Sequence, residues 1–458
     1  MSNQTKYNSF RRTYPEMVYA GYEYGVQPDG LHIVFTFRIG EDIVFSPTAM
    51  IPNRTFLKWD NLQKRIDRLV FNIGMIELVS YWKCYCPPRV RVLCGSLETD
   101  EVEFWKKTYF NGLGEFFYVN GIEATQEDFM EIVSEGKAKD CNPEKGSTHL
   151  AQDATLVPVG GGKDSVVTLS LLGEATRVVP LIMNPRGATT NCVTAAGLTM
   201  EDTLVIQRTI HPRLLELNRE GCLNGHTPFS AMLAFYTLLA AELSGIGNIA
   251  LSNESSANEP TVLAGKAGAN VNHQYSKSLE FENDFRSFVS RFVCGEYNYY
   301  SFLRPLTELQ IAMLFSKEEV FFDVFRSCNA GSKEDIWCGK CAKCLFAFII
   351  LSPFIAPERL TSIFGKNLLE DEDLRLFFEQ LTGNAPTKPF ECVGTVDEVN
   401  SALSMAITRW YKDRRPRLLT NYQPLPPNTP LATLQASHNL TPQLFNLLAK
   451  HVQAAAID

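Results

Sequence analysis

The sequence has no excess of positive charge. It contains 43 lysine and arginine residues against 51 aspartate and glutamate residues, for a formal net charge of −8. Its clearest basic cluster lies at residues 409–417. This charge balance argues against general binding to nucleic acids or to membrane surfaces. Histidine is also scarce, with seven in the chain, so histidines in polar stretches stand out as candidate acid–base groups.

Long apolar runs are missing as well. Residues 1–12 have no apolar segment of the secretory type, and the most apolar stretch, residues 344–355, is interrupted by Ser352 and Pro353. Of the twelve cysteines, three lie in a Cys-x-x-Cys-x-x-Cys run, which suits metal or redox chemistry in a reducing compartment. We therefore expect a cytoplasmic protein that does not cross a membrane.

The order of predicted elements divides the chain into three parts. Residues 1–150 mix strand and helix patterns, which predicts an α+β domain that ends in a polar linker near residues 134–152. Residues 151–350 alternate strands and helices, which predicts an α/β domain with a doubly wound parallel sheet. Residues 351–458 are expected to be helical with a proline-rich tail. In the α/β domain, strands are predicted at 155–159, 178–183 and 248–252, and helices at 165–172, 203–217 and 229–243. A kink or break is expected at Pro212 in the second of these helices.

A glycine turn connects the first of these strands to its helix. Backbone N–H groups and the positive end of the helix dipole would face this turn, as an anion cradle requires. A Walker A loop needs Ser or Thr directly after its Lys, but Asp164 stands there. An acid beside a polyphosphate implies a bridging divalent cation, for which we expect Mg²⁺. The predicted cofactor-binding residues are Gly160, Gly161, Gly162, Lys163, Asp164 and Ser165.

This stretch resembles the PP-loop, Ser-Gly-Gly-x-Asp-Ser, of the ATP pyrophosphatases, with Gly160 in place of the leading Ser. The resemblance implies that ATP is cut between its α- and β-phosphates and that AMP passes to a substrate oxygen. The alternative is an ordinary glycine-rich β–α turn without a ligand. Pro158 is awkward in a central strand, so we expect it at the strand's end. Polar residues also follow the other two strands, at 184–186 and 253–256, and we expect the three loops to form one crevice.

Four cysteines in a short segment predict a zinc site. Cys-x-x-Cys spacing supplies the thiolates that tetrahedral Zn²⁺ prefers, and Gly339 allows the tight turn between them. Four protein ligands leave no open position, so the metal would be structural. The arrangement resembles the zinc site of 7-cyano-7-deazaguanine synthase, itself a PP-loop enzyme, and the alternative is a set of reduced structural cysteines. The predicted ligands are Cys328, Cys338, Cys341 and Cys344.

Together, these motifs resemble the UDP-N-acetyl-α-D-muramoyl-L-alanyl-L-glutamate epimerase family, MurL. The resemblance extends from about residue 150 to 405. It implies ATP- and Mg²⁺-dependent inversion of the terminal L-glutamate of UDP-MurNAc-L-Ala-L-Glu, with release of AMP and diphosphate, in peptidoglycan precursor synthesis. The residues that carry the resemblance lie at 157–165, 223–226, 252–255, 271–278, 304–310, 337–344 and 389–395.

The chemistry of such an inversion indicates which residue types to seek. A proton beside an ionised carboxylate is hard to remove, because the carbanion adds charge to charge. Transfer of AMP to the carboxylate cancels that charge, after which a base removes the proton and an acid returns one to the opposite face. Cys222 or Cys392 is an alternative proton carrier, because cysteine pairs serve cofactor-free amino-acid racemases. The predicted catalytic residues are Asp164, His226, His273 and Lys277, with Tyr275 and Glu254 behind them.

Two other functions fit parts of the sequence. One is another adenylating PP-loop enzyme that forms an amide or nitrile, like the deazapurine synthase. The other is a nucleotide-binding regulatory or tRNA-binding module, against which the net charge of −8 weighs. The partners expected for the epimerase are small molecules, ATP and UDP-MurNAc-L-Ala-L-Glu.

Overall fold

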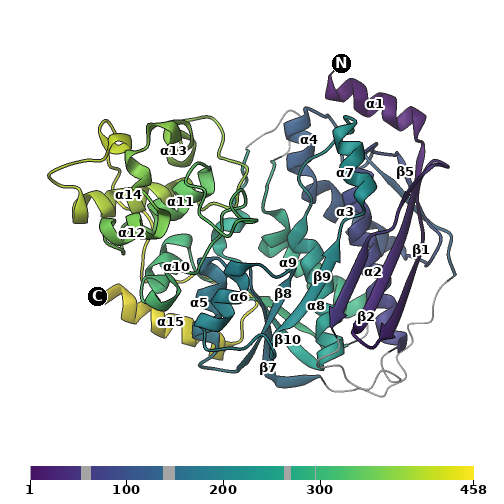
Figure 1. Ribbon diagram of the computed structural model, residues 1–458, viewed down its shortest axis with the longest axis horizontal. Helices are drawn as coiled ribbons and strands as arrows, with labels where there is room; N and C mark the ends of the chain where they lie inside the picture. The colour runs from purple at the N-terminus through teal and green to yellow at the C-terminus, as the bar shows by residue number, and fades with distance from the viewer. Residues whose placement is uncertain (1, 53–62, 138–149, 263–269, 294, 458) are drawn as a thin grey trace. The chain divides into compact units, whose positions relative to one another are not determined.

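The computed structural model describes residues 2–52, 63–137, 150–262, 270–293 and 295–457 (Figure 1). In these ranges the chain forms a mixed α/β fold, which confirms the α/β class expected from the sequence. None of the described helices has both the length and the apolar character needed to cross a bilayer.

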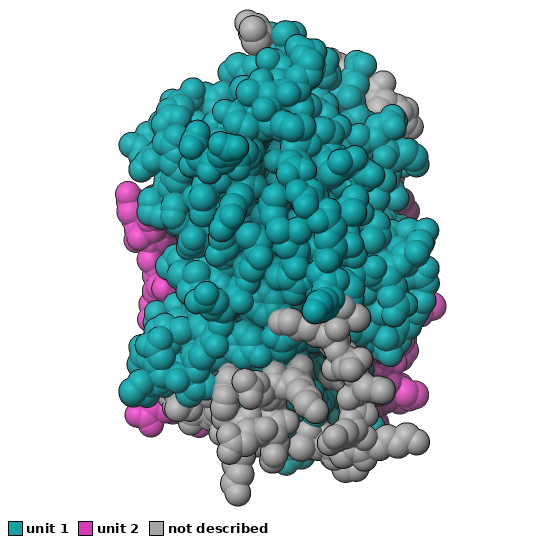
Figure 2. All heavy atoms as spheres, turned by 90° about the vertical axis from the view of Figure 1, so that its right-hand side faces the viewer, with its two compact units in different colours: residues 1–156, 204–249, 262–299 teal, residues 157–203, 250–261, 300–458 magenta. Residues whose placement is uncertain are grey.

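The chain divides into two compact units, which Figure 2 shows in different colours. Strands β7 (Ala151–Pro158), β10 (Ile246–Leu251) and β11 (Asn298–Ser301) each begin in the first unit and end in the second. The division expected at residues 150 and 350 stays a prediction, and residues 138–149 of the expected linker lie outside the described ranges. The first unit consists of Met1–Leu156, Leu204–Ile249 and Val262–Tyr299, and the second of Val157–Thr203, Ala250–Thr261 and Tyr300–Asp458.

The strands of the first unit form a mixed sheet. Strand β2 pairs antiparallel with β1, β3 and β4, and β4 pairs antiparallel with β9. Strand β5 runs parallel to both β1 and β6. The parallel sheet was expected for residues 151–350 alone, where β7 and β10 are parallel, whereas the antiparallel pairs join strands of residues 16–52 to one another and β4 to β9. Short turns join neighbouring strands such as β1 and β2, and only antiparallel strands allow this. The bounds are β1 (Glu16–Gln27), β2 (Gly30–Ile39), β3 (Ile43–Phe45), β4 (Thr48–Pro52), β5 (Arg89–Val92), β6 (Glu131–Ser134) and β9 (Leu204–Thr209).

The predicted helix over residues 203–217 is wrong for residues 204–209, which form β9, whereas the break expected at Pro212 is confirmed by the start of α7 there. In β9 the side chains of Leu204 and Ile206 are buried and their neighbours are not, which is the two-residue period of a strand. Pro212 begins α7, where a missing N–H group breaks no helical hydrogen bond. The helices of the first unit are α1 (Asn3–Thr13), α2 (Gln63–Trp82), α3 (Thr99–Gly112), α4 (Gly114–Asn120), α7 (Pro212–Arg219), α8 (Phe229–Ser244) and α9 (Leu279–Phe292).

The second unit consists mainly of helices, together with β8 and the last residues of β7, β10 and β11. Strand β7 runs parallel to β10 and ends at Pro158, as predicted, and α5 follows it after the glycine turn. Helix α5 packs against α10, which also contacts the buried helix α11. The remaining bounds are β8 (Arg177–Met183), α5 (Lys163–Leu172), α6 (Gly187–Ala195), α10 (Glu308–Phe315), α11 (Ala342–Leu351), α12 (Pro357–Phe364), α13 (Arg375–Thr382), α14 (Val396–Trp410) and α15 (Pro442–Ile457).

Candidate functional site

The glycine turn of the second unit has a fixed backbone. Gly161 has φ +81°, and a Cβ atom there would lie 2.9 Å from the Cβ of Ala188, so a larger residue does not fit. The carbonyl of Gly161 accepts a hydrogen bond from the N–H of Arg326 at 2.6 Å. Gly162 is the N-cap residue of α5, so the unpaired N–H groups of the first helical turn lie at the glycine turn. This backbone arrangement can receive an anion.

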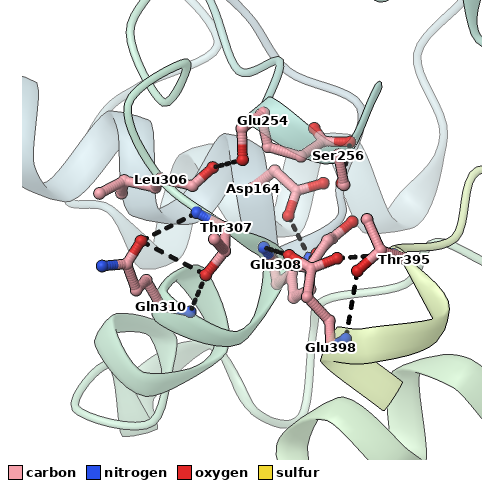
Figure 3. A network of polar contacts seen from close by, with 11 residues as sticks. Asp164, Glu254, Ser256, Leu306, Thr307, Glu308, Gln310, Thr395 and Glu398 are labelled. Carbon is pink, nitrogen blue, oxygen red and sulfur yellow. Dashed lines mark hydrogen bonds and ion pairs between the residues drawn. The ribbon is translucent and has the colours of Figure 1, made fainter. Parts of the chain in front are cut away.

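Carboxylates gather at the start of α5 (Figure 3). Asp164, Glu254 and Glu308 each offer an oxygen atom, and these atoms lie within 4.8 Å of one another. Asp164 belongs to α5, Glu254 lies in the loop after β10, and Glu308 begins α10, whose N-cap is Thr307. The Nζ atom of Lys163 forms ion pairs with Asp164 and Glu308. We call Lys163, Asp164, Glu254 and Glu308 the acidic cluster.

The acidic cluster is mostly shielded from solvent. The exposed fraction is 2% for Glu254, 3% for Glu308 and 7% for Lys163, whereas the side chain of Asp164 is 32% exposed. Burial would lower the pKa of Lys163, but the carboxylates of Asp164 and Glu308 outweigh it and raise that pKa. Burial raises the pKa of Glu308 well above its usual range, although Lys163 opposes the shift. Three acids share one ammonium, so this cluster suits a divalent cation with oxygen ligands, such as Mg²⁺.

Two further residues hold the acidic cluster in place. Glu398 of α14 accepts the N–H of Glu308 at 2.7 Å through Oε1 and the N–H of Thr395 at 2.6 Å through Oε2. Thr395 is the N-cap of α14, so Glu398 completes a capping box while it fixes the start of α10. The guanidinium of Arg304, which is fully buried, donates to the backbone carbonyl of Glu254 at 2.5 Å. Both residues therefore position the acids.

A second polar cluster lies in the first unit. One carboxylate oxygen of Glu115, in α4, is 2.6 Å from Nδ1 of His273 and 3.3 Å from Nδ1 of His226. The centroids of the two imidazole rings are 4.6 Å apart, and the ring planes are tilted by 54°. The exposed fractions of these side chains are 18% for Glu115, 10% for His273 and 23% for His226. We call these three residues the histidine cluster.

A buried lysine fixes the segment that carries His226. The Nζ atom of Lys83 donates to the backbone carbonyls of Gly225 and His226 and to the hydroxyl of Thr227, the last at 2.6 Å. Burial lowers the pKa of Lys83 to about 8. Burial, followed by the neighbouring His273, lowers the pKa of His226 to about 4. His226 is therefore neutral at pH 7 and able to accept a proton.

The other predicted proton carriers of the first unit differ in their suitability. Tyr275 begins the short helix η3 (Tyr275–Lys277) and is 5% exposed. Burial raises the pKa of its hydroxyl above the usual range, which makes Tyr275 a poor proton carrier near neutral pH. Lys277 is close enough for its charge to contribute to the lowered pKa of His226. Burial also raises the pKa of Cys222, which disfavours this alternative carrier.

The four predicted zinc ligands lie together in the second unit, with their sulfur atoms within 4.8 Å of one another. The Sγ atoms of Cys328 and Cys341 are 3.9 Å apart, and those of Cys338 and Cys344 are 3.7 Å apart. Sulfur atoms on a tetrahedral Zn²⁺, with Zn–S distances of about 2.3 Å, are separated by about 3.8 Å. None of these cysteines forms a disulfide. The geometry of the donor atoms fits the metal.

The predicted site residues thus fall into groups. The second unit contains the glycine turn, Asp164, Glu254 and the four cysteines, and the first unit contains the predicted histidines, Lys277 and Tyr275. Sequence reasoning gave no role to Glu308, although it lies in a stretch that carries the resemblance. It also missed Glu115 and Lys83, which lie in or near helical patterns with no polar motif. Only their contacts with the predicted histidines reveal them.

Comparison with known proteins finds matches over most of the chain. The model of the MurL N-terminal domain matches residues 8–302, and that of the MurL C-terminal domain matches residues 324–429. The chain is 33% identical over 427 residues to the UDP-N-acetyl-alpha-D-muramoyl-L-alanyl-L-glutamate epimerase of Xanthomonas oryzae pv. oryzae, covering 90% of this chain and 92% of that protein. It is 35% identical over 345 residues to the protein of the same name from Salinispora tropica, covering 74% and 73%. No solved structure matches this chain.

Proposed function

Because the chain belongs to the MurL family, we propose that it is an epimerase that converts the terminal L-glutamate of UDP-MurNAc-L-Ala-L-Glu to D-glutamate. We further propose that the reaction consumes ATP, proceeds through an acyl-adenylate and serves peptidoglycan precursor synthesis. The fold of the second unit would then be of the PP-loop ATP pyrophosphatase type.

The observation that supports ATP chemistry most directly is the position of the acidic cluster at the glycine turn. The turn and the start of α5 offer backbone N–H groups to phosphate oxygens, and Lys163 offers a positive charge beside them. Asp164, Glu254 and Glu308 would hold Mg²⁺, since hard cations prefer carboxylate oxygens and these acids lie close together. A bound Mg²⁺ would neutralise phosphate charge and orient the nucleotide.

Masking of the substrate carboxylate explains why an epimerase would need a nucleotide. Attack of the α-carboxylate oxygen on the α-phosphorus of ATP forms the acyl-adenylate and releases diphosphate. Loss of the α-proton then places its electron pair on the acyl group as an enolate, instead of beside a carboxylate charge. Return of a proton to the opposite face inverts the centre, and water releases AMP. His226 is a suitable base for this proton, because it is neutral at pH 7.

The four-cysteine cluster contributes to the proposal as a structural element. Its sulfur spacing suits Zn²⁺, and a tetrathiolate site leaves no position open for a substrate. We therefore propose that zinc ties the segment at Cys328 to the start of α11, without a part in the reaction.

The proposal is tested with the purified full-length chain, ATP, Mg²⁺ and UDP-MurNAc-L-Ala-L-Glu in D₂O. We expect D-glutamate in the dipeptide, deuterium at its α-carbon, and AMP formation that depends on the dipeptide. Inversion at full speed without a nucleotide would contradict the acyl-adenylate. Diphosphate release at the same rate with and without the dipeptide would favour a different adenylating enzyme. Diphosphate release that requires ammonia would do the same.

A further inference from the structure

The histidine cluster has a geometry that restricts how it can move protons. Two imidazoles, on segments far apart in sequence, contact the same oxygen of one carboxylate, that of Glu115. A carboxylate accepts hydrogen bonds and donates none, so Nδ1 of His273 carries the proton of its hydrogen bond to Glu115, while Nδ1 of His226 lies 3.3 Å from the same oxygen. In His273, proton exchange with a substrate therefore falls to the opposite nitrogen, Nε2, as in other imidazoles that a carboxylate orients.

The spacing of the two rings places them on one side of any substrate. An inversion with two carriers needs one group on each face of the α-carbon, and each must reach it at about 3 Å. The two nitrogen atoms would then be about 6 Å apart, and the ring centres farther apart still. The observed centroid distance is 4.6 Å, and both rings contact one oxygen atom of Glu115. No substituted carbon fits between His226 and His273.

The charges around the histidine cluster favour proton transfer over metal binding. Two imidazoles and a carboxylate are a donor set that transition metals also use. However, Lys83 is hydrogen-bonded to the backbone of His226, and Lys277 is near enough to lower the pKa of His226. Two ammonium groups repel a dication, whereas they stabilise an anion such as an enolate.

From this geometry we infer that Glu115, His226 and His273 act as one proton-transfer unit on a single face of the glutamate α-carbon. Glu115 is a positioning residue, and the proton on the other face is carried by a different group. In the step assigned to this unit, the α-proton moves to an imidazole nitrogen, Nε2 in the case of His273, while the C–H electron pair becomes the enolate. Solvent later exchanges that proton. This inference rests on the proposed epimerase function.

The test follows deuterium in the L-dipeptide during turnover. His226→Gln, His273→Gln and Glu115→Gln are each incubated with UDP-MurNAc-L-Ala-L-Glu, ATP and Mg²⁺ in D₂O. Three quantities are measured: dipeptide-dependent diphosphate release, deuterium in the recovered L-dipeptide, and formation of the D-dipeptide. His32→Gln is the matched control, since His32 pairs with Asp29 at 2.8 Å on the surface of the same unit.

We expect both histidine variants to lose inversion by about 10²-fold or more and to show the same deuterium pattern in the L-dipeptide. Glu115→Gln should follow that pattern with a loss of about 10-fold or more in kcat and little change in KM, and Glu115→Asp should restore part of the rate. Retained diphosphate release shows that each variant is folded. His32→Gln should match the wild type.

Opposite deuterium patterns would overturn the inference. If one histidine variant incorporates deuterium at the α-carbon of the L-dipeptide without inversion while the other incorporates none, the two imidazoles act on opposite faces of the α-carbon. Wild-type rates for Glu115→Gln, or for either histidine variant, would also overturn it. Failure of the proposed function gives a different result, because the wild-type chain would then form no AMP in response to the dipeptide.

Discussion

Lys163 forms ion pairs with two carboxylates at the start of α5, and an oxygen of Glu254 lies close to theirs. Burying several acids around one ammonium is unfavourable unless a further cation shares their charge. The cluster is therefore an arrangement expected of a ligand site, because neutral side chains at these buried positions would give a more stable fold. The exposed fraction of Asp164, 32%, leaves this carboxylate the most accessible of the three.

Replacement of Asp164 separates this role from folding. Asp164→Asn should reduce dipeptide-dependent AMP formation by about 10²-fold or more, because a ligand of the dication is lost. The free energy of unfolding should change by no more than about 1 kcal/mol, because this ion pair is partly exposed. Activity assays and urea denaturation measure the two effects. The control is Asp202→Asn, at an exposed carboxylate that accepts a hydrogen bond from Thr199, and it should leave AMP formation and the free energy of unfolding unchanged. Wild-type activity in Asp164→Asn would contradict the cation site.

His226 makes the stability of the chain sensitive to acid. Its pKa is about 4 in the folded chain and about 6.5 when unfolded, because burial, His273, Lys83 and Lys277 lower it while Glu115 raises it. Between these values the unfolded chain binds more protons, so stability is present at pH 7 and is lost as the pH falls from 6.5 toward 4. We expect about 2 kcal/mol to be lost between pH 7 and 5 from this group.

Urea denaturation at several pH values checks this expectation. The loss between pH 7 and 5 should be smaller in His226→Gln by about 2 kcal/mol, since glutamine does not titrate. His32→Gln, at the surface, should keep the pH dependence of the wild type. An equal pH dependence in His226→Gln and the wild type would show that His226 does not carry this effect.

Among the elements, the glycine turn shows how local backbone geometry fixes a site. Gly161 has φ +81° and lies against Ala188, so its conformation and its surroundings both exclude a side chain. Strand, turn and helix were correctly predicted here, because an apolar run, glycines and a helical period follow one another directly. Pro158 was correctly placed at the strand's end.

Gly161→Ala should therefore destabilise the chain through backbone strain of about 1–2 kcal/mol and through the contact with Ala188. Gly197→Ala is a matched control, since Gly197 has φ +74° with no atom within 4 Å of the added Cβ. Gly197→Ala should show only the strain. Thermal unfolding compares the two variants, and equal losses would indicate that the space at Gly161 is not restricted.

The four-cysteine segment was also predictable as an element, because its ligands are close in sequence. Cys328 lies outside the Cys-x-x-Cys-x-x-Cys run, so spacing alone does not fix its position. Its sulfur nevertheless lies with those of the other three cysteines. Cys341→Ser should lose about one equivalent of zinc and several kcal/mol of stability, since folded structure and metal binding are coupled. Metal analysis of freshly purified protein and thermal unfolding measure these losses, with Cys392→Ser as the control. Wild-type chain without zinc would contradict the site.

At the scale of the whole molecule, prediction from sequence was limited by contacts between distant segments. The α/β class followed from the alternation of patterns, but the antiparallel pairing of β4 with β9 joins residues far apart in the chain. The acidic cluster combines residues 164, 254 and 308 for the same reason. Glu115 contacts His273, which is 158 positions away in the sequence. The local periodicity of the sequence does not predict such a contact. Motif reasoning found the histidines and missed their shared carboxylate.

The three strands that pass from one unit to the other limit how this protein can be cut or recombined. A fragment ending near residue 302, where the first family match stops, would retain α5 but lose α10, its packing partner. Expressed alone, such a fragment would expose apolar surface and depend on its missing half for solubility. Circular permutation, or exchange of halves between relatives, should therefore disrupt folding when the cut lies between the two family matches. The chain folds as one piece in this respect.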